Sequence, residues 1–121
     1  MNIRRLMQGL SYLGDVTGKR QTYHVFRATD AFLVASFSRT KRGAGYFNVV
    51  AADEVDRVRS RFAGKRGVTA KDVARRKGSR RAPKPLVALN VLYVLVALGA
   101  ARIDTRRSGP KLFFNVLSSR G

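Results

Sequence analysis

The first half of the chain changes from a helical to a strand-like hydrophobic period. Five apolar residues recur at helical spacing near the start: Ile3, Leu6, Met7, Leu10 and Leu13. They predict an amphipathic helix over residues 2 to about 13. Short β-rich runs then occupy residues 23–28, 32–38 and 45–50, with turn-like segments between them. The sequence therefore predicts an N-terminal helix followed by an antiparallel β-meander.

The second half returns to the helical period. Residues 53–63 place apolar side chains along one stripe behind two acids, which suit the positive end of a helix. A second helix is predicted over residues 70–77, with Thr69 and Asp72 as a reciprocal capping pair. Val68 is then placed to pack on Val73 across the start of this helix.

A third helix and a hairpin are predicted at the C-terminal end. Pro83 and Pro85 suit the entry and first turn of a helix over residues 85–98, and Gly99 suits its end. Residues 101–105 and 111–117 resemble two strands joined by a basic turn. The predicted class is α+β, with one module over residues 1–50 and another over residues 51–121. A chain of 121 residues is long enough for the two modules to share one core.

Composition narrows the class of protein. The chain has 25 Lys and Arg against 7 Asp and Glu, a formal charge of +18, yet its 45% hydrophobic content is too high for a disordered chain. The absence of cysteine excludes disulfides, and a single histidine leaves no zinc-finger spacing. Gln8, Gly9 and Ser11 interrupt the N-terminal apolar positions, so no targeting segment is expected there. We expect a cytoplasmic protein with no cofactor and no metal.

The positive charge is concentrated in three segments of the chain. Residues 65–84 carry nine Lys or Arg against one acid, Asp72, and further cations lie in the turns near residues 39–42 and 106–111. A folded element with this charge is best explained by nucleic acid as its partner. The predicted contact residues are Arg39, Lys41, Arg42, Lys71, Arg75, Arg76, Lys77, Arg80, Arg81, Lys84, Asn90, Arg106, Arg107 and Lys111.

The C-terminal half resembles the winged helix-turn-helix superfamily in the order of its elements. The residues that carry the resemblance are an uncharged run ending in Leu98 and Gly99, the following residues 100–104, and a basic, Gly-containing hairpin that ends in residues 111–116. The resemblance implies that residues 85–98 form the recognition helix and that the hairpin is the wing. It implies a non-catalytic transcription factor or chromosome-associated protein, nucleoid-associated in a prokaryote, whose partner is double-stranded DNA.

The predicted recognition helix is unusually apolar for contact with a major groove. Only Asn90 and Tyr93 interrupt its hydrophobic run, whereas base readout needs polar side chains. We therefore expect the start of this helix, with Arg80, Arg81 and Lys84, to meet phosphates while the helix body packs. The body would pack against the N-terminal meander or, in a homodimer, against a second copy of the chain.

Three alternatives stay open at this point. An RNA-binding or ribonucleoprotein component would use Tyr46 and Phe47 to stack on exposed bases. A metal-dependent nuclease would need acids on adjacent strands, but the nearest are Asp30 in a turn and Asp53 at a helix start. Residues 85–101 are uncharged, yet a membrane span needs roughly 20 apolar residues, so we expect a buried helix and no membrane.

Overall fold

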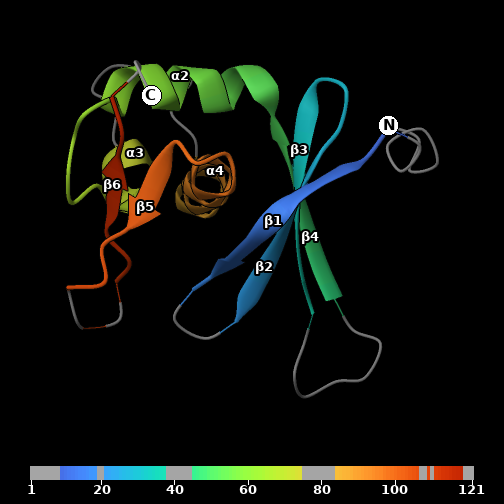
Figure 1. Ribbon diagram of the computed structural model, residues 1–121, viewed down its shortest axis with the longest axis horizontal. Helices are drawn as coiled ribbons and strands as arrows, with labels where there is room; N and C mark the ends of the chain where they lie inside the picture. Colours follow the sequence, from blue (N-terminus) through green and yellow to red (C-terminus); the bar gives the residue numbers. More distant parts are fainter. Residues whose placement is uncertain are drawn as a thin grey trace.

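A long apolar helix lies between a four-stranded sheet and a two-stranded hairpin (Figure 1). The computed structural model describes residues 9–18, 21–37, 45–74, 84–106, 109 and 111–118. Together these residues form an α+β fold, which confirms the predicted class.

The larger sheet is an antiparallel meander. Its strands are β1 (Ser11–Thr17), β2 (Thr22–Arg27), β3 (Ala31–Phe37) and β4 (Gly45–Ala51), and each one pairs with the next. Three of the four strands match the prediction.

The remaining strand, β1, replaces the end of the predicted N-terminal helix, so that prediction was wrong for residues 11–13. Leu10 and Leu13 fit a helical period, but hydrogen bonding to β2 determines the conformation here. Residues 2–8 of the predicted helix lie outside the described residues.

The two faces of this sheet differ in what covers them. Cross-strand partners share a face, and Val25, Val34 and Asn48 are partners on the face toward the long helix. The opposite face, called the outer sheet face below, carries the neighbouring row Phe26, Leu33 and Val49. Exposed aromatic residues also lie there: Tyr12, Phe37 and Phe47.

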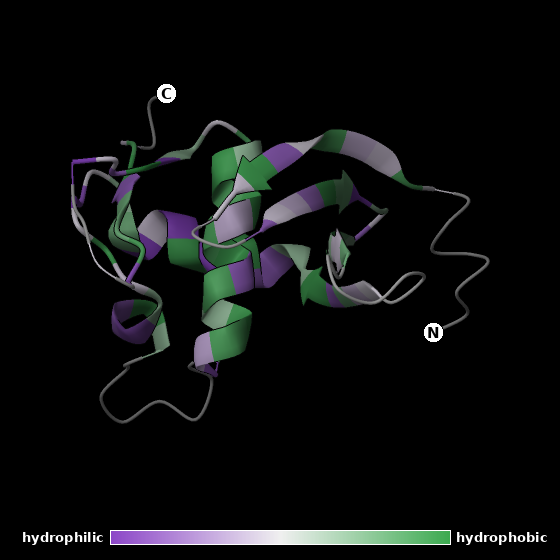
Figure 2. Ribbon diagram, turned by 90° about the horizontal axis from the view of Figure 1, so that it is seen from below, coloured by the Kyte–Doolittle hydropathy of each residue, from purple (hydrophilic) through white to green (hydrophobic). Residues whose placement is uncertain are grey.

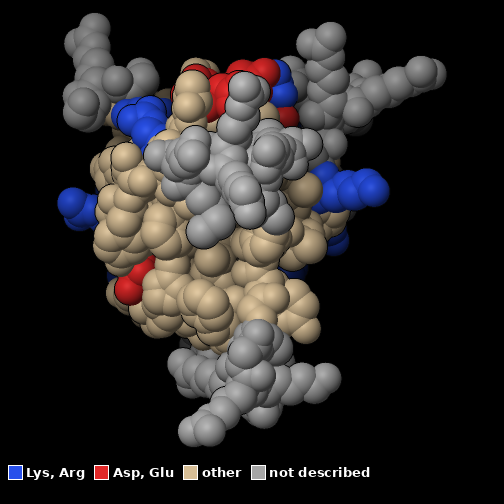
Figure 3. All heavy atoms as spheres, turned by 90° about the vertical axis from the view of Figure 1, so that its right-hand side faces the viewer, with Lys and Arg blue, Asp and Glu red and all other residues tan. Residues whose placement is uncertain are grey.

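The outer sheet face carries little charge. No outward-pointing residue of the four described strands is Lys or Arg. Viewed from this side, the described Lys and Arg side chains lie at the margins of the molecule (Figure 3).

Two helices connect the sheet to the rest of the core. The first, α2 (Ala52–Phe62), has acids in its first turn and buries Val55, Val58 and Phe62, as its sequence stripe predicts. The next helix, α3 (Ala70–Ala74), begins with the predicted capping pair. Thr69 N–H donates to Asp72 Oδ2 at 3.0 Å, and Asp72 N–H donates to Thr69 Oγ1 at 3.2 Å. The rest of the helix predicted to residue 77 lies outside the described residues.

The third helix, α4 (Pro85–Ala97), is buried through most of its length. Apolar residues dominate it (Figure 2), and it contacts all four strands of the sheet, α2, α3 and the first strand of the hairpin. Seven of its residues are buried: Ala88, Asn90, Val91, Leu92, Tyr93, Val94 and Leu95. This confirms that the body of α4 packs inside the chain. Among the described residues, no helix has the length and hydrophobicity needed to cross a membrane.

An aromatic column ties the two halves of the chain together. The Tyr23 ring of β2 stacks on the Tyr93 ring of α4 with centroids 4.2 Å apart, and Tyr93 meets the edge of Phe114 at 6.1 Å. Burial, with the neighbouring Tyr23 hydroxyl, raises the pKa of Tyr93 above its usual value. A single cluster of buried apolar residues includes members from both predicted modules.

The hairpin closes the far side of α4. Its strands are β5 (Ala101–Ile103) and β6 (Phe114–Val116), both shorter than predicted. Val68, in the loop before α3, exchanges two backbone hydrogen bonds of 2.8 Å with Phe114. The loop between α2 and α3 is therefore attached to the edge of the hairpin. Gly99, with a φ of +76°, ends α4 as predicted and turns the chain into β5.

Candidate nucleic-acid interface

The face of the hairpin that points away from α4 is basic. Ala101, Phe114 and Val116 are buried against the core, so the strand alternation turns their neighbours outward. Arg102 and Asn115 are direct cross-strand partners on this outward face. Both Arg66, from the loop after α2, and Arg106, from the turn after β5, are exposed beside it.

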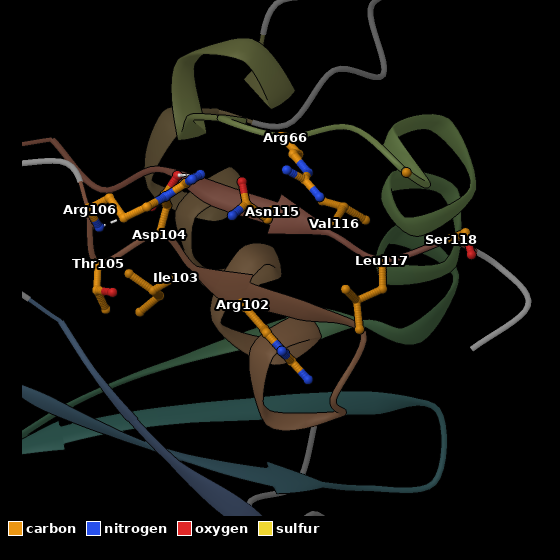
Figure 4. Close-up of a pocket in the computed structure, with 11 residues that line it drawn as sticks. Arg66, Arg102, Ile103, Asp104, Thr105, Arg106, Asn115, Val116, Leu117 and Ser118 are labelled. Carbon is orange, nitrogen blue, oxygen red and sulfur yellow. Dashed lines mark hydrogen bonds and ion pairs between the residues drawn. The ribbon is translucent and has the colours of Figure 1, made fainter.

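These arginines surround a shallow groove of about 470 Å³, called the hairpin groove below. Asn115 lies between Arg66 and Arg106, and Arg102 lies at another edge of the groove (Figure 4). Thr105 and Ser118 add hydroxyl groups to its lining. Three guanidinium groups, one amide and two hydroxyls thus line one open surface.

Backbone hydrogen bonds place Arg66 next to the hairpin. Val116 N–H donates to Lys65 O at 2.8 Å, and Gly64 N–H donates to Leu117 O at 3.3 Å. The Gly67 N–H donates to the Asn115 side-chain oxygen at 3.0 Å. Because these bonds lie on both sides of residue 66, the backbone that carries this arginine is held against β6.

A buried carboxylate orients Arg106. The guanidinium group of Arg106 donates from Nε to Asp104 Oδ1 and from Nη2 to Asp104 Oδ2, both at 3.1 Å, and the Arg106 backbone N–H donates to Oδ1 at 3.0 Å. Hydrogen bonds from the Arg106 side chain and backbone lower the pKa of Asp104 to about 2. Asp104 is therefore ionised at neutral pH and offsets one of the three positive charges, while it holds Arg106 in one orientation.

The predicted contact residues fall into three groups. Lys71, Lys84, Arg106 and Lys111 are exposed, at α3, before α4 and on the hairpin. Asn90 was predicted to contact nucleic acid from the recognition helix, but only 3% of its surface is exposed and its Nδ2 donates to Leu86 O at 2.9 Å. The rest lie outside the described residues: Arg39, Lys41, Arg42, Arg75, Arg76, Lys77, Arg80, Arg81 and Arg107.

Two arginines of the hairpin groove were not predicted from the sequence. The signal for Arg102 was present, because strand alternation around Ala101 and Ile103 sends the residue between them outward. Arg66 belongs to the basic run over residues 65–84, but no local signal places it beside the hairpin. Hydrogen bonds of its neighbours with residues about fifty positions further along the chain bring it to the groove.

A second cavity, of about 310 Å³, lies between the inner sheet face and the first half of α4. Its lining includes Tyr23, Ser36, Asn48, Asn90 and the exposed Tyr46. No Lys, Arg, Asp or Glu is among the described residues that line it. This cavity is therefore chemically distinct from the hairpin groove.

Several acids near the strands and at the start of α2, including Asp53, pair with other side chains. On α2, Asp53 and Glu54 both accept hydrogen bonds from Arg57. His24 Nδ1 lies 2.7 Å from Asp15 Oδ1, and the Tyr12 hydroxyl donates to the same oxygen at 2.6 Å. These bonds lower the pKa of Asp15. In the part of the chain that the structure describes, no three His, Asp or Glu side chains form a cluster that could hold a metal ion.

Comparisons with known proteins found no family model, no curated protein and no solved structure that matches the chain. The proposals below therefore rest on charge, exposure and geometry.

Proposed function

We propose that the protein is a non-catalytic DNA-binding protein that holds duplex DNA largely through phosphate contacts at the hairpin groove. The observation that carries the proposal is the grouping of Arg66, Arg102 and Arg106 on one open surface of a chain with a formal charge of +18. Its role would be that of a transcription factor or a chromosome-associated protein, cytoplasmic and, in a prokaryote, bound to the nucleoid.

The chemistry of the hairpin groove suits a phosphate backbone. Guanidinium groups donate two parallel hydrogen bonds to phosphate oxygens, and amide and hydroxyl groups are common additional donors. Arg66 and Arg102 have no acid among the described residues of the groove lining other than Asp104, which already binds Arg106. Phosphate is therefore the complementary ligand for the two remaining arginines.

The order of elements supports the winged-helix resemblance, with α2, α3 and α4 followed by the hairpin as wing. The burial of α4 supports a winged-helix mode of binding in which the body of α4 does not contact the DNA. Since the α4 body contacts the sheet and the rest of the core, only its exposed start with Lys84, Leu86 and Val87 is available to a partner. Binding would then depend more on phosphates than on base edges, and base specificity would be weak.

RNA is the second candidate, because the sheet exposes aromatic side chains that can stack on unpaired bases. Phe37 and Phe47 are more than half exposed on the outer sheet face, and Tyr46 is exposed on the opposite face. Single-stranded nucleic acids are commonly bound by such rings. Competition between a DNA duplex and a structured RNA of equal length distinguishes the two candidates.

The test is a salt titration of binding to a labelled random-sequence duplex, read by fluorescence anisotropy. An Arg66→Ala/Arg102→Ala variant should flatten the slope of log affinity against log salt by about 1.8, since each lost phosphate contact contributes about 0.9. The matched control is Arg27→Ala/Arg57→Ala, which removes two exposed arginines from the sheet and α2. Equal slope changes in both variants would show that net charge alone, and not the hairpin groove, determines binding.

A further inference from the structure

The cavity between the sheet and α4 combines rings, amides and hydroxyls. The ring of Tyr23 and the Tyr93 ring stacked on it are mostly buried, whereas 71% of the surface of Tyr46 is exposed. The cavity lining therefore includes both buried and exposed aromatic rings. Gln21 Nε2 donates to the Tyr23 hydroxyl at 3.0 Å. Asn48 adds a half-buried amide from β4.

Buried polar groups are concentrated at this cavity. The described residues include three buried polar or charged side chains, Ser36, Asn90 and Asp104. Asp104 is paired with Arg106, and Asn90 donates from Nδ2 to Leu86 O at 2.9 Å within α4, while Ser36 and Asn90 both line the cavity. Asn90 also interrupts the apolar run of α4, where a leucine would avoid the cost of burying an amide. Polar groups in such positions are characteristic of a ligand site.

The lining indicates a flat, neutral ligand with a hydrogen-bonding edge. The described residues of the lining include no charged side chain, so none of them gives a phosphate or carboxylate a counter-ion. Amide side chains pair well with the donor and acceptor pattern of a nucleobase, and tyrosine rings stack on its faces. The volume of about 310 Å³ is at the lower end of the range for small-molecule sites, which suits a single base.

We propose that this cavity takes up one unpaired nucleobase of a bound nucleic-acid strand. The proposal rests on the nucleic-acid binding proposed above and adds a second site with different chemistry. Lys84 is exposed two residues before Leu86, which lines the cavity, and it supplies a cation for the phosphate of the same nucleotide. A free mononucleotide has the same chemistry, so the source must be separated by experiment.

The experiment compares three labelled DNA duplexes with the full chain: one blunt, one with a short single-stranded overhang, and one whose overhang is abasic. A stacked base should make the natural overhang bind at least about 5-fold more tightly than the abasic overhang. Tyr46→Ala should remove this preference. Phe37→Ala is the matched control, because it deletes an equally exposed ring from the opposite face of the same sheet and should keep the preference.

Asn90→Leu is a second variant, with a thermal melt to report its fold. A folded variant that has lost the overhang preference would support the proposal. If the variant fails to fold, Tyr46→Ala decides the question, since its exposed side chain contributes little to the core. Equal binding of natural and abasic overhangs by the wild-type chain would overturn the proposal, and so would loss of the preference in Phe37→Ala but not in Tyr46→Ala.

Adenosine 5′-monophosphate separates the two sources of the base. Failure of the mononucleotide to displace the overhang at millimolar concentration would support a strand as the ligand. If the mononucleotide displaces the overhang at the concentration at which the overhang itself binds, the proposal that the base comes from a nucleic-acid strand would be overturned. Blunt-duplex binding that stays sensitive to Arg66→Ala/Arg102→Ala, with no overhang preference, would reject this cavity alone and leave the proposed function in place.

Discussion

The hairpin and the four-stranded sheet are both antiparallel, and each exposes one face. The exposed face of the hairpin is basic, whereas that of the sheet is aromatic. The hairpin presents arginines around the groove (Figure 4). The outer sheet face presents Tyr12, Phe37 and Phe47, without a lysine or arginine among its described residues. Both faces follow the same strand alternation, with their buried neighbours in one core. The charged side chains of the described residues are therefore distributed unevenly between the two faces, and the faces are expected to meet different chemistry.

The largest expected effect is a loss of stability caused by a substitution in the core that both regions share. Leu92 of α4 is fully buried, and Leu92→Ala should reduce the free energy of unfolding by about 2–5 kcal/mol through a cavity in the core. Urea denaturation should show one transition for the sheet and the hairpin together. Leu86→Ala, at an exposed position of the same helix, is the control and should change stability little. Two separate transitions would mean that the regions fold independently.

The next effect compares an arginine of the hairpin groove with an exposed arginine at the end of β2. Arg102→Glu should weaken duplex binding by about tenfold or more, because it removes a cation from the hairpin groove and adds repulsion of phosphates. The same charge change at Arg27, on the sheet, should weaken binding much less. Anisotropy at fixed salt measures both variants. A comparable loss for Arg27→Glu would show that the sheet is also part of the interface.

The pH dependence of stability should differ between the two faces. The pKa of Asp104 is about 2 in the folded chain and 3.8 as the ordinary value, so its ionised form stabilises the fold above about pH 4. That contribution is lost as the pH falls from about 4 to 2. Asp104→Asn should therefore lower Tm at pH 7. The Tm difference between this variant and the wild type should become smaller as the pH falls through this acidic range.

Hydrogen bonds from Tyr12 and His24 lower the pKa of Asp15 on the outer sheet face. Asp15→Asn should therefore also lower Tm at pH 7, and its Tm difference from the wild type should also shrink in acid. Asp15 is much more exposed than Asp104, and solvent should make its effect smaller. Thermal melts of both variants between pH 2 and pH 7 measure the two differences. A Tm difference for Asp104→Asn that does not change with pH would contradict the assigned pKa.

The smallest expected effect is on the outer sheet face. Phe47→Ser should change duplex affinity by less than about twofold, because the aromatic ring neutralises no phosphate. Its effect on stability should stay within about 0.5 kcal/mol, as is usual for exposed positions. Anisotropy and urea denaturation measure the two quantities. A tenfold loss of affinity would instead assign this face to the nucleic-acid interface.

The elements that the sequence predicted well are those with local signals. The Thr69–Asp72 capping pair, the α2 stripe with Phe62 at its end, and the α4 end at Gly99 each depend on residues a few positions apart. The start of β1 was mispredicted, since Leu10 and Leu13 suit either a helix or a strand until β2 is present as a partner.

The sequence by itself determined the charge, the α+β class, the helix caps and the apolar character of α4, because each depends on composition or on neighbouring residues. Only the tertiary structure decided which side chains face a partner. It buried Asn90, attached Arg66 to β6 and stacked Tyr23 on Tyr93. The physical reason is that exposure and charge clustering arise from contacts between segments far apart in the chain, and no local period records them.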